Sequence, residues 1–144
     1  MSISENIGKI KKTIKTDTIL VVVSKKQSNE NILAAYQSGQ RNFGENQVKE
    51  LKEKVEKLPK DIKWHMIGHL QRNKVKYIAS FITLIHSVDS IKLLLEINKR
   101  ATQFNKIINC LLQVHIAKEK SKYGFNFAEI REFFKNQLDE SYKN

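Results

Sequence analysis

The first residue with clear chemical potential is a lysine that follows an apolar segment. Residues 19–23, Ile-Leu-Val-Val-Val, lead directly to Ser24 and Lys25. Valine favours extended backbone, and a run that is apolar at every position is typical of a strand buried on both faces of a parallel sheet. In α/β folds, ligands bind at the carboxyl ends of such strands. A lysine there, half out of water, could lose its proton and condense with a carbonyl compound; alternatively it simply extends into solvent.

Further polar side chains follow the later apolar segments. Because the carboxyl ends of parallel strands meet at one edge, we expect these side chains to gather at one rim. The charged group that recurs there is lysine, which suits a Schiff base with either a carbonyl substrate or pyridoxal phosphate. The rim candidates are Ser24, Lys25, Glu45, Asn46, His65, His69, His86, Ser87, Gln113, His115 and Lys122.

Other chemistries find little support in the sequence. His65 and His69 have the spacing of a zinc-binding helix, but Gly68 and the strand pattern deny them a common helical face, so we expect no metal site. Cys110 lies in the middle of a predicted strand, away from the rim. No Ser-His-Asp or Cys-His arrangement stands out.

Composition indicates one globular domain over residues 1–144, with 40% hydrophobic and 28% charged residues. The net charge of +11 admits a nucleic-acid-binding module as an alternative function. However, arginine is scarce and many lysines pair with glutamates at helical spacing, so we favour a solvated lysine-rich surface. With no apolar run suited to a bilayer or a signal peptide, and with Cys110 as the single cysteine, the sequence predicts a cytoplasmic protein.

Helix and strand signals alternate along the whole chain. Capping boxes at Ser2 and Asn126 and N-cap residues at Ser28 and Ser90 mark helix starts, and Gly39 ends a helix. A further helix follows Asn46, and a short one lies within residues 71–80. The predicted strands are residues 19–25, a short segment that breaks at Gly44, and residues 62–68, 81–88 and 107–116.

Apolar spacing predicts the buried side of the later helices. The predicted buried residues are Val48, Leu51, Val55 and Leu58 in one helix, Ile91, Leu94, Leu95 and Ile97 in the next, and Phe127, Ile130, Phe133, Phe134 and Leu138 in the last.

The alternation of strands and helices implies a parallel sheet with right-handed crossovers. Such a sheet is either open and doubly wound or part of a (β/α)8 barrel. No glycine-rich nucleotide-binding motif follows the first strand, which disfavours a nucleotide-binding sheet.

Several segments, in this order and spacing, resemble the pyridoxal phosphate homeostasis protein family. The segments are residues 21–25 (Val-Val-Val-Ser-Lys), 39–46 (Gly-Gln-Arg-Asn-Phe-Gly-Glu-Asn), 64–74 (Trp-His-Met-Ile-Gly-His-Leu-Gln-Arg-Asn-Lys), 86–90 (His-Ser-Val-Asp-Ser), 112–116 (Leu-Gln-Val-His-Ile) and 121–125 (Ser-Lys-Tyr-Gly-Phe). The resemblance covers nearly the whole chain.

The resemblance implies a parallel (β/α) TIM-type barrel similar to the N-terminal domain of alanine racemase. Carried over, Lys25 holds pyridoxal phosphate as a Schiff base and Asn46 lies beside the cofactor. His65 and Ser87 line the barrel mouth less directly, and Lys122 is a neighbouring lysine that could accept the cofactor.

The implied function is to hold and hand on the cofactor, and so to take part in intracellular pyridoxal phosphate homeostasis without robust catalysis. Racemases of this fold use a second domain that supplies another acid–base group, which this family lacks. A lysine-dependent enzyme, such as a weak amino-acid racemase, is the alternative. Pyridoxal-phosphate-dependent apoenzymes are possible partners; a membrane or nucleic acid is not expected.

The length suggests a shortened barrel. An eight-stranded barrel usually takes about 250 residues, and this chain of 144 resembles about the first five of eight β/α units. The resemblance assigns the phosphate cradle to the later units. Because such a partial barrel exposes strand edges, we expect self-association or poor stability, which ultracentrifugation would detect.

Overall fold

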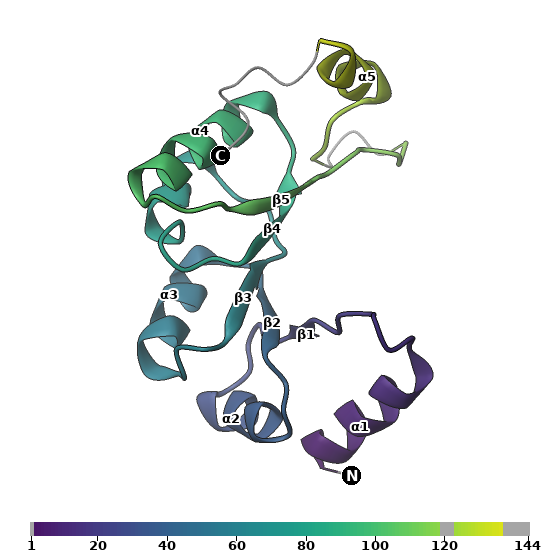
Figure 1. Ribbon diagram of the computed structural model, residues 1–144, viewed down its shortest axis with the longest axis vertical. Helices are drawn as coiled ribbons and strands as arrows, with labels where there is room; N and C mark the ends of the chain where they lie inside the picture. Colours follow the sequence, from purple (N-terminus) through teal and green to yellow (C-terminus); the bar gives the residue numbers. More distant parts are fainter. Residues whose placement is uncertain (1, 119–122, 137–144) are drawn as a thin grey trace.

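The computed structural model describes residues 2–118 and 123–136, and it contains a parallel sheet flanked by helices (Figure 1). The strands are β1 (Val22–Val23), β2 (Asn42–Glu45), β3 (Lys63–Met66), β4 (Leu84–Val88) and β5 (Asn109–Leu112). The helices are α1 (Ile3–Thr13), α2 (Asn29–Gln37), α3 (Val48–Lys57), the 3-10 helix η1 (Arg72–Tyr77), α4 (Ile91–Gln103) and α5 (Phe127–Lys135).

The five strands form one sheet in the order β1-β2-β3-β4-β5, and every neighbouring pair is parallel. Figure 1 shows α2, α3 and α4 along one side of this sheet, with α1 beyond β1 and α5 beyond β5. Strands that follow one another in both sequence and space, each joined by a helical crossover, are typical of a (β/α) barrel wall rather than a doubly wound sheet. The predicted barrel-type fold is therefore confirmed, and the sheet is not closed among the described residues.

The predicted caps are present at the ends of the helices. Ser2 and Asn126 both form complete capping boxes, and the side chains of Ser28 and Ser90 cap α2 and α4. Gly39 follows α2 with φ 89°, a left-handed conformation that favours glycine. These caps fix where each helix begins and therefore where each preceding loop leaves the sheet.

The hydrophobic core lies between the sheet and helices α2, α3 and α4. Phe43 and Trp64 are neighbours across β2 and β3, and their ring centroids lie 6.1 Å apart. Met66 and Ile85 continue the same layer with no exposed surface. We call this side of the sheet the helix face, and the opposite side the second face.

The first strand is shorter and more exposed than predicted. It was predicted to be buried on both faces over residues 19–25, but β1 contains only Val22 and Val23, and Val23 is 48% exposed. The reason is position: β1 pairs with β2 alone, and its second face has no covering layer among the described residues.

Two helices differ in part from the predicted burial. In α4, Ile97 is buried and Ile91 and Leu94 pack against the core as predicted, but Leu95 is exposed, and Leu93 and Ala101 are buried instead. In α5 no residue is buried, and Phe127 and Phe134 are exposed. This helix lies beyond the edge of the sheet instead of on its face (Figure 1). The predicted residue Leu138 lies outside the described residues.

None of the described helices has the length and hydropathy needed to cross a membrane.

Candidate functional site

Lys25 occupies a tight turn immediately after β1. The amide of Gln27 donates a hydrogen bond to the Ser24 carbonyl at 3.0 Å, which closes the turn around Lys25 and Lys26. Lys26 has φ 61°, in the left-handed region that residues with a side chain rarely adopt. Lys25 itself is exposed, so its amine is accessible from solvent at the carboxyl edge of the sheet.

A buried ionic network lies directly beneath this turn. Glu45, at the end of β2, is fully buried on the helix face, and its Oε1 accepts from Lys54 Nζ at 2.7 Å. Lys54 Nζ also donates to Glu50 Oε1 at 2.6 Å and to the Ser24 carbonyl at 2.7 Å. All three donors of the ammonium group are therefore used. The hydrogen bond from Lys54 holds the pKa of the Glu50 carboxyl below its usual value.

The loops that follow β2, β3 and β4 are packed together along the same edge. A Cβ atom on Gly68 would lie 2.4 Å from the Asn46 carbonyl oxygen, so only glycine allows this contact. Ser87 Oγ donates to the Gly68 carbonyl at 2.5 Å. Next to Gly68, His69 Nδ1 lies 3.1 Å from Asp89 Oδ2, and its ring stacks on Tyr123 at 3.6 Å. Contacts between neighbouring loops therefore run without interruption along the edge of the sheet around Asn46.

A second polar cluster lies deeper, on the second face of the sheet. His65 Nε2 lies 3.0 Å from Asn42 Oδ1, and His65 Nδ1 lies 2.9 Å from His86 Nε2. Burial is the main cause that lowers the pKa of His65 to about 4, and burial also lowers the pKa of His86. Both rings are therefore neutral at pH 7. Because Asn42 Oδ1 only accepts, His65 Nε2 donates to it, and His65 Nδ1 accepts from His86 Nε2.

The structure separates the predicted rim residues into three groups. Lys25 and Asn46 lie in the loops at the carboxyl edge, whereas His65 lies within β3 and Ser87 within β4. The prediction that Glu45 lies at the rim is wrong. Side chains alternate along a strand, and that of Glu45 points toward α3, where it pairs with Lys54. Lys122 lies outside the described residues.

Lys54 is the residue that sequence reasoning missed. The pair Glu50–Lys54 has the i,i+4 spacing that is typical of a solvent-exposed helix pair, so the spacing alone indicates an exposed lysine. The informative signal was its position between Leu51 and Leu58, which places a lysine on the buried side of α3. A lysine inside an apolar stripe requires a buried partner, and Glu45 provides it.

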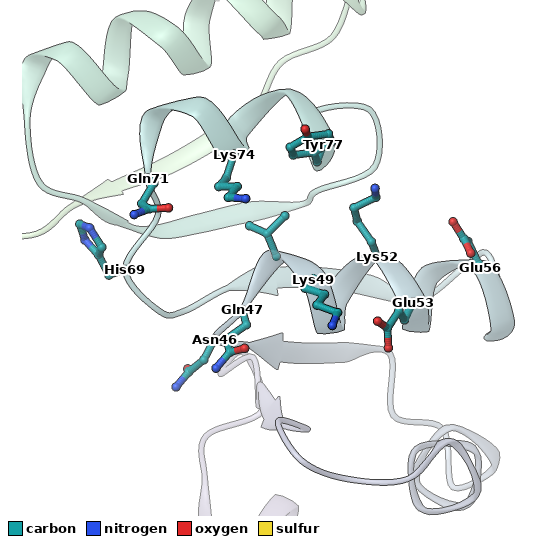
Figure 2. A pocket seen from close by; sticks show the side chains of 11 residues that line it. Asn46, Gln47, Lys49, Lys52, Glu53, Glu56, His69, Gln71, Lys74 and Tyr77 are labelled. Carbon is teal, nitrogen blue, oxygen red and sulfur yellow. The ribbon is translucent and has the colours of Figure 1, made fainter.

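An open groove of about 610 Å³ adjoins the edge between α3 and η1, and Figure 2 shows its side chains. Lys52 Nζ lies 4.7 Å from the centre of the Tyr77 ring within this groove. Most of the residues that line it are polar or charged, with charges of both signs, although the stems of their side chains make much of its surface apolar: Asn46, Gln47, Val48, Lys49, Lys52, Glu53, Glu56, His69, Gln71, Lys74 and Tyr77.

Parallel strands in sequential order, each followed by a helix, with helices packed on one face, define the class of (β/α) barrel domains. Within that class, a family model described as "Alanine racemase, N-terminal domain" matches residues 1–142. The chain belongs to this family.

Curated relatives bear the name that the sequence segments suggested. The pyridoxal phosphate homeostasis protein of Helicobacter pylori (strain 26695) is 44% identical over 128 residues, which cover 86% of this chain and 56% of that protein. The protein of the same name from Schizosaccharomyces pombe is 37% identical over 128 residues, covering 88% of this chain and 54% of that protein. This chain thus spans a little over half the length of these relatives.

A solved structure confirms the arrangement of the elements. PipY of Synechococcus elongatus, in the form described as having pyridoxal phosphate bound, superposes with a TM-score of 0.86 at 31% identity. The match covers 96% of this chain and 66% of PipY. The family resemblance inferred from the sequence and the predicted fold are both confirmed.

Proposed function

We propose that this chain binds pyridoxal phosphate through a Schiff base on Lys25 and takes part in intracellular pyridoxal phosphate homeostasis. The observation that carries the proposal is the accessible Lys25 turn at the carboxyl edge of β1, in a fold shared with a relative described as having this cofactor bound. A Schiff base requires an amine that an aldehyde can reach, and this edge offers one.

The residues around Lys25 fit such a ligand. Asn46 follows the neighbouring strand and is half-buried, so its amide side chain is available to orient a polar ring. Ser87 fixes the backbone of Gly68 beside Asn46, and His65 supports the second face below the edge. Lys122 remains a proposed neighbouring acceptor. The bound cofactor supplies an electrophilic aldehyde; the chain supplies the amine and its surroundings.

We propose a carrier and not an efficient catalyst. Racemisation needs an acid and a base on opposite sides of the reacting carbon. Of the imidazoles near the site, His65 and His86 are hydrogen-bonded to each other, and His69 pairs with Asp89. The names of the relatives, homeostasis proteins, support this role. We further propose that the protein is cytoplasmic, that residues 1–144 form one domain and that apoenzymes dependent on this cofactor receive it.

Borohydride trapping tests the proposal. The chain is incubated with pyridoxal phosphate, reduced, digested and analysed by mass spectrometry. We expect the pyridoxyl label on Lys25, its loss from that peptide in Lys25→Ala, and its retention in Lys57→Ala, a change at an exposed lysine of α3. A dominant label on another lysine would overturn the proposal. Amino-acid racemisation that Lys25→Ala abolishes would instead favour the enzyme alternative.

A further inference from the structure

The buried network beneath Lys25 contacts the backbone on both sides of that residue. The carbonyl of Ser24 belongs to the peptide group before Lys25, and it accepts from Lys54 Nζ at 2.7 Å. The amide of Lys26 belongs to the peptide group after Lys25, and it donates to Glu50 Oε1 at 2.7 Å. The two peptide groups that flank the reactive amine are therefore both attached to α3.

The network is itself fixed from two sides. Ser24 Oγ donates to Glu45 Oε1 at 2.6 Å, and the same oxygen accepts from Lys54 at 2.7 Å. Lys54 is 6% exposed and Glu45 is fully buried, so water competes little for these bonds. The turn, the end of β2 and α3 are consequently held together by these bonds.

Lys26 shows that this attachment has a conformational cost. A residue with a side chain in the left-handed region persists only where its surroundings impose that conformation. Here two hydrogen bonds hold the exposed Lys26 in that conformation: the bond from Gln27 N–H to the Ser24 carbonyl closes the turn, and the bond from Lys26 N–H to Glu50 attaches it to α3. The turn that contains this residue changes the direction of the chain just beyond β1.

We infer that Glu50, together with the Glu45–Lys54 pair, is a positioning device that selects Lys25 over its neighbour Lys26 as the amine that reacts with the aldehyde. This inference rests on the proposed function. It adds that selectivity between two adjacent and chemically equal amines comes from hydrogen bonds to the backbone, made by side chains that never touch the cofactor.

The distribution of the trapped label between Lys25 and Lys26 tests this inference. The chain is loaded with pyridoxal phosphate and reduced as above, and the ratio of label on the two lysines is measured. Glu50→Ala removes the acceptor for Lys26 N–H, and loss of a hydrogen bond to a charged group should lower the ratio roughly tenfold. Glu50→Gln keeps an acceptor oxygen and should largely restore the ratio.

Glu53→Ala is the matched control, because Glu53 is an exposed glutamate of the same helix. Its ratio should equal that of the wild type, and circular dichroism should show the same fold for all variants. If Glu50→Ala and Glu53→Ala give the same ratio, the positioning inference is wrong while the proposed function stands. If the wild type carries no label on Lys25, the proposed function fails and the inference fails with it.

Discussion

The two faces of the sheet serve different purposes. The helix face holds Phe43, Trp64 and the buried Glu45–Lys54 pair, and it is covered by α2, α3 and α4 (Figure 1). The second face holds the Asn42–His65–His86 chain, with half-exposed Val23 and Leu111 on the outer strands. Because neighbouring residues of a strand point to opposite faces, each strand contributes to both. The helix-covered core and the histidine cluster are thus interleaved in sequence but separated in space.

The sharpest way to test this contrast is to remove one apolar side chain from each face. Phe43→Ala leaves a cavity beneath the helices and should lower the free energy of unfolding by about 4 kcal/mol. Leu111→Ala, at a residue 49% exposed on the second face, should cost less than about 1 kcal/mol. Urea unfolding measures both. Equal losses would show that the second face is also packed in solution.

Breaking the buried pair should have the next largest effect. Lys54→Met leaves the Glu45 carboxylate buried without its partner and should destabilise the fold by about 3 kcal/mol. Lys57→Met, at an exposed lysine of the same helix, should change stability by less than about 0.5 kcal/mol.

The double variant Glu45→Gln with Lys54→Met sharpens that result. It removes both charges, so most of the lost stability should return. If the double variant is as unstable as Lys54→Met, the lysine contributes through packing of its stem and not through its charge.

Acid should lower the free energy of unfolding, because the imidazole groups on the second face resist protonation in the folded chain. The pKa of His65 is lowered to about 4 in the folded chain, whereas an unfolded histidine titrates near 6.5. The unfolded state therefore takes up the proton first, and stability should fall by up to about 3 kcal/mol as the pH decreases from about 6.5 to about 4.

Unfolding measured across that pH range tests the role of His65. His65→Gln should flatten the pH dependence, because it removes the titrating group and keeps a polar side chain. Ser87→Ala, which loses the bond to Gly68 without removing a titrating group, should retain the wild-type slope. An unchanged slope in His65→Gln would assign the pH dependence to other groups.

The smallest effect on stability should come from Lys25, the residue that we propose binds the cofactor. Lys25→Ala changes an exposed side chain in a turn held by its backbone, so the midpoint of urea unfolding should move by less than about 0.5 kcal/mol in free energy. The same variant should lose the borohydride-trapped label. A large loss of stability would mean that the Lys25 side chain is part of the core.

The sequence predicted those features that depend on local signals. Ser2, Ser28, Ser90 and Asn126 cap helices because a side-chain oxygen three residues from an amide is sufficient, whatever the rest of the chain does. The parallel sheet and the edge position of Lys25 followed from alternation, whereas the choice of a barrel over a doubly wound sheet came from the family resemblance.

Features that depend on distant partners were not predicted. The spacing of Lys54 fits a solvated ion pair, and only the position of Glu45 relative to α3 shows that it is buried. Likewise, the apolar composition of residues 19–25 does not show how many strands pair with this segment, and within the described part of the chain β1 pairs with β2 alone. In α4, the predicted stripe missed Leu93 because several adjacent apolar residues allow more than one inner side.

Gly68 limits how the proposed ligand site at this edge of the sheet could be redesigned. Since even one added methyl group would collide with the Asn46 backbone, a variant library gains nothing from randomising that position. Diversity is better placed at Asn46, where the side chain can change without moving the main chain on which it stands.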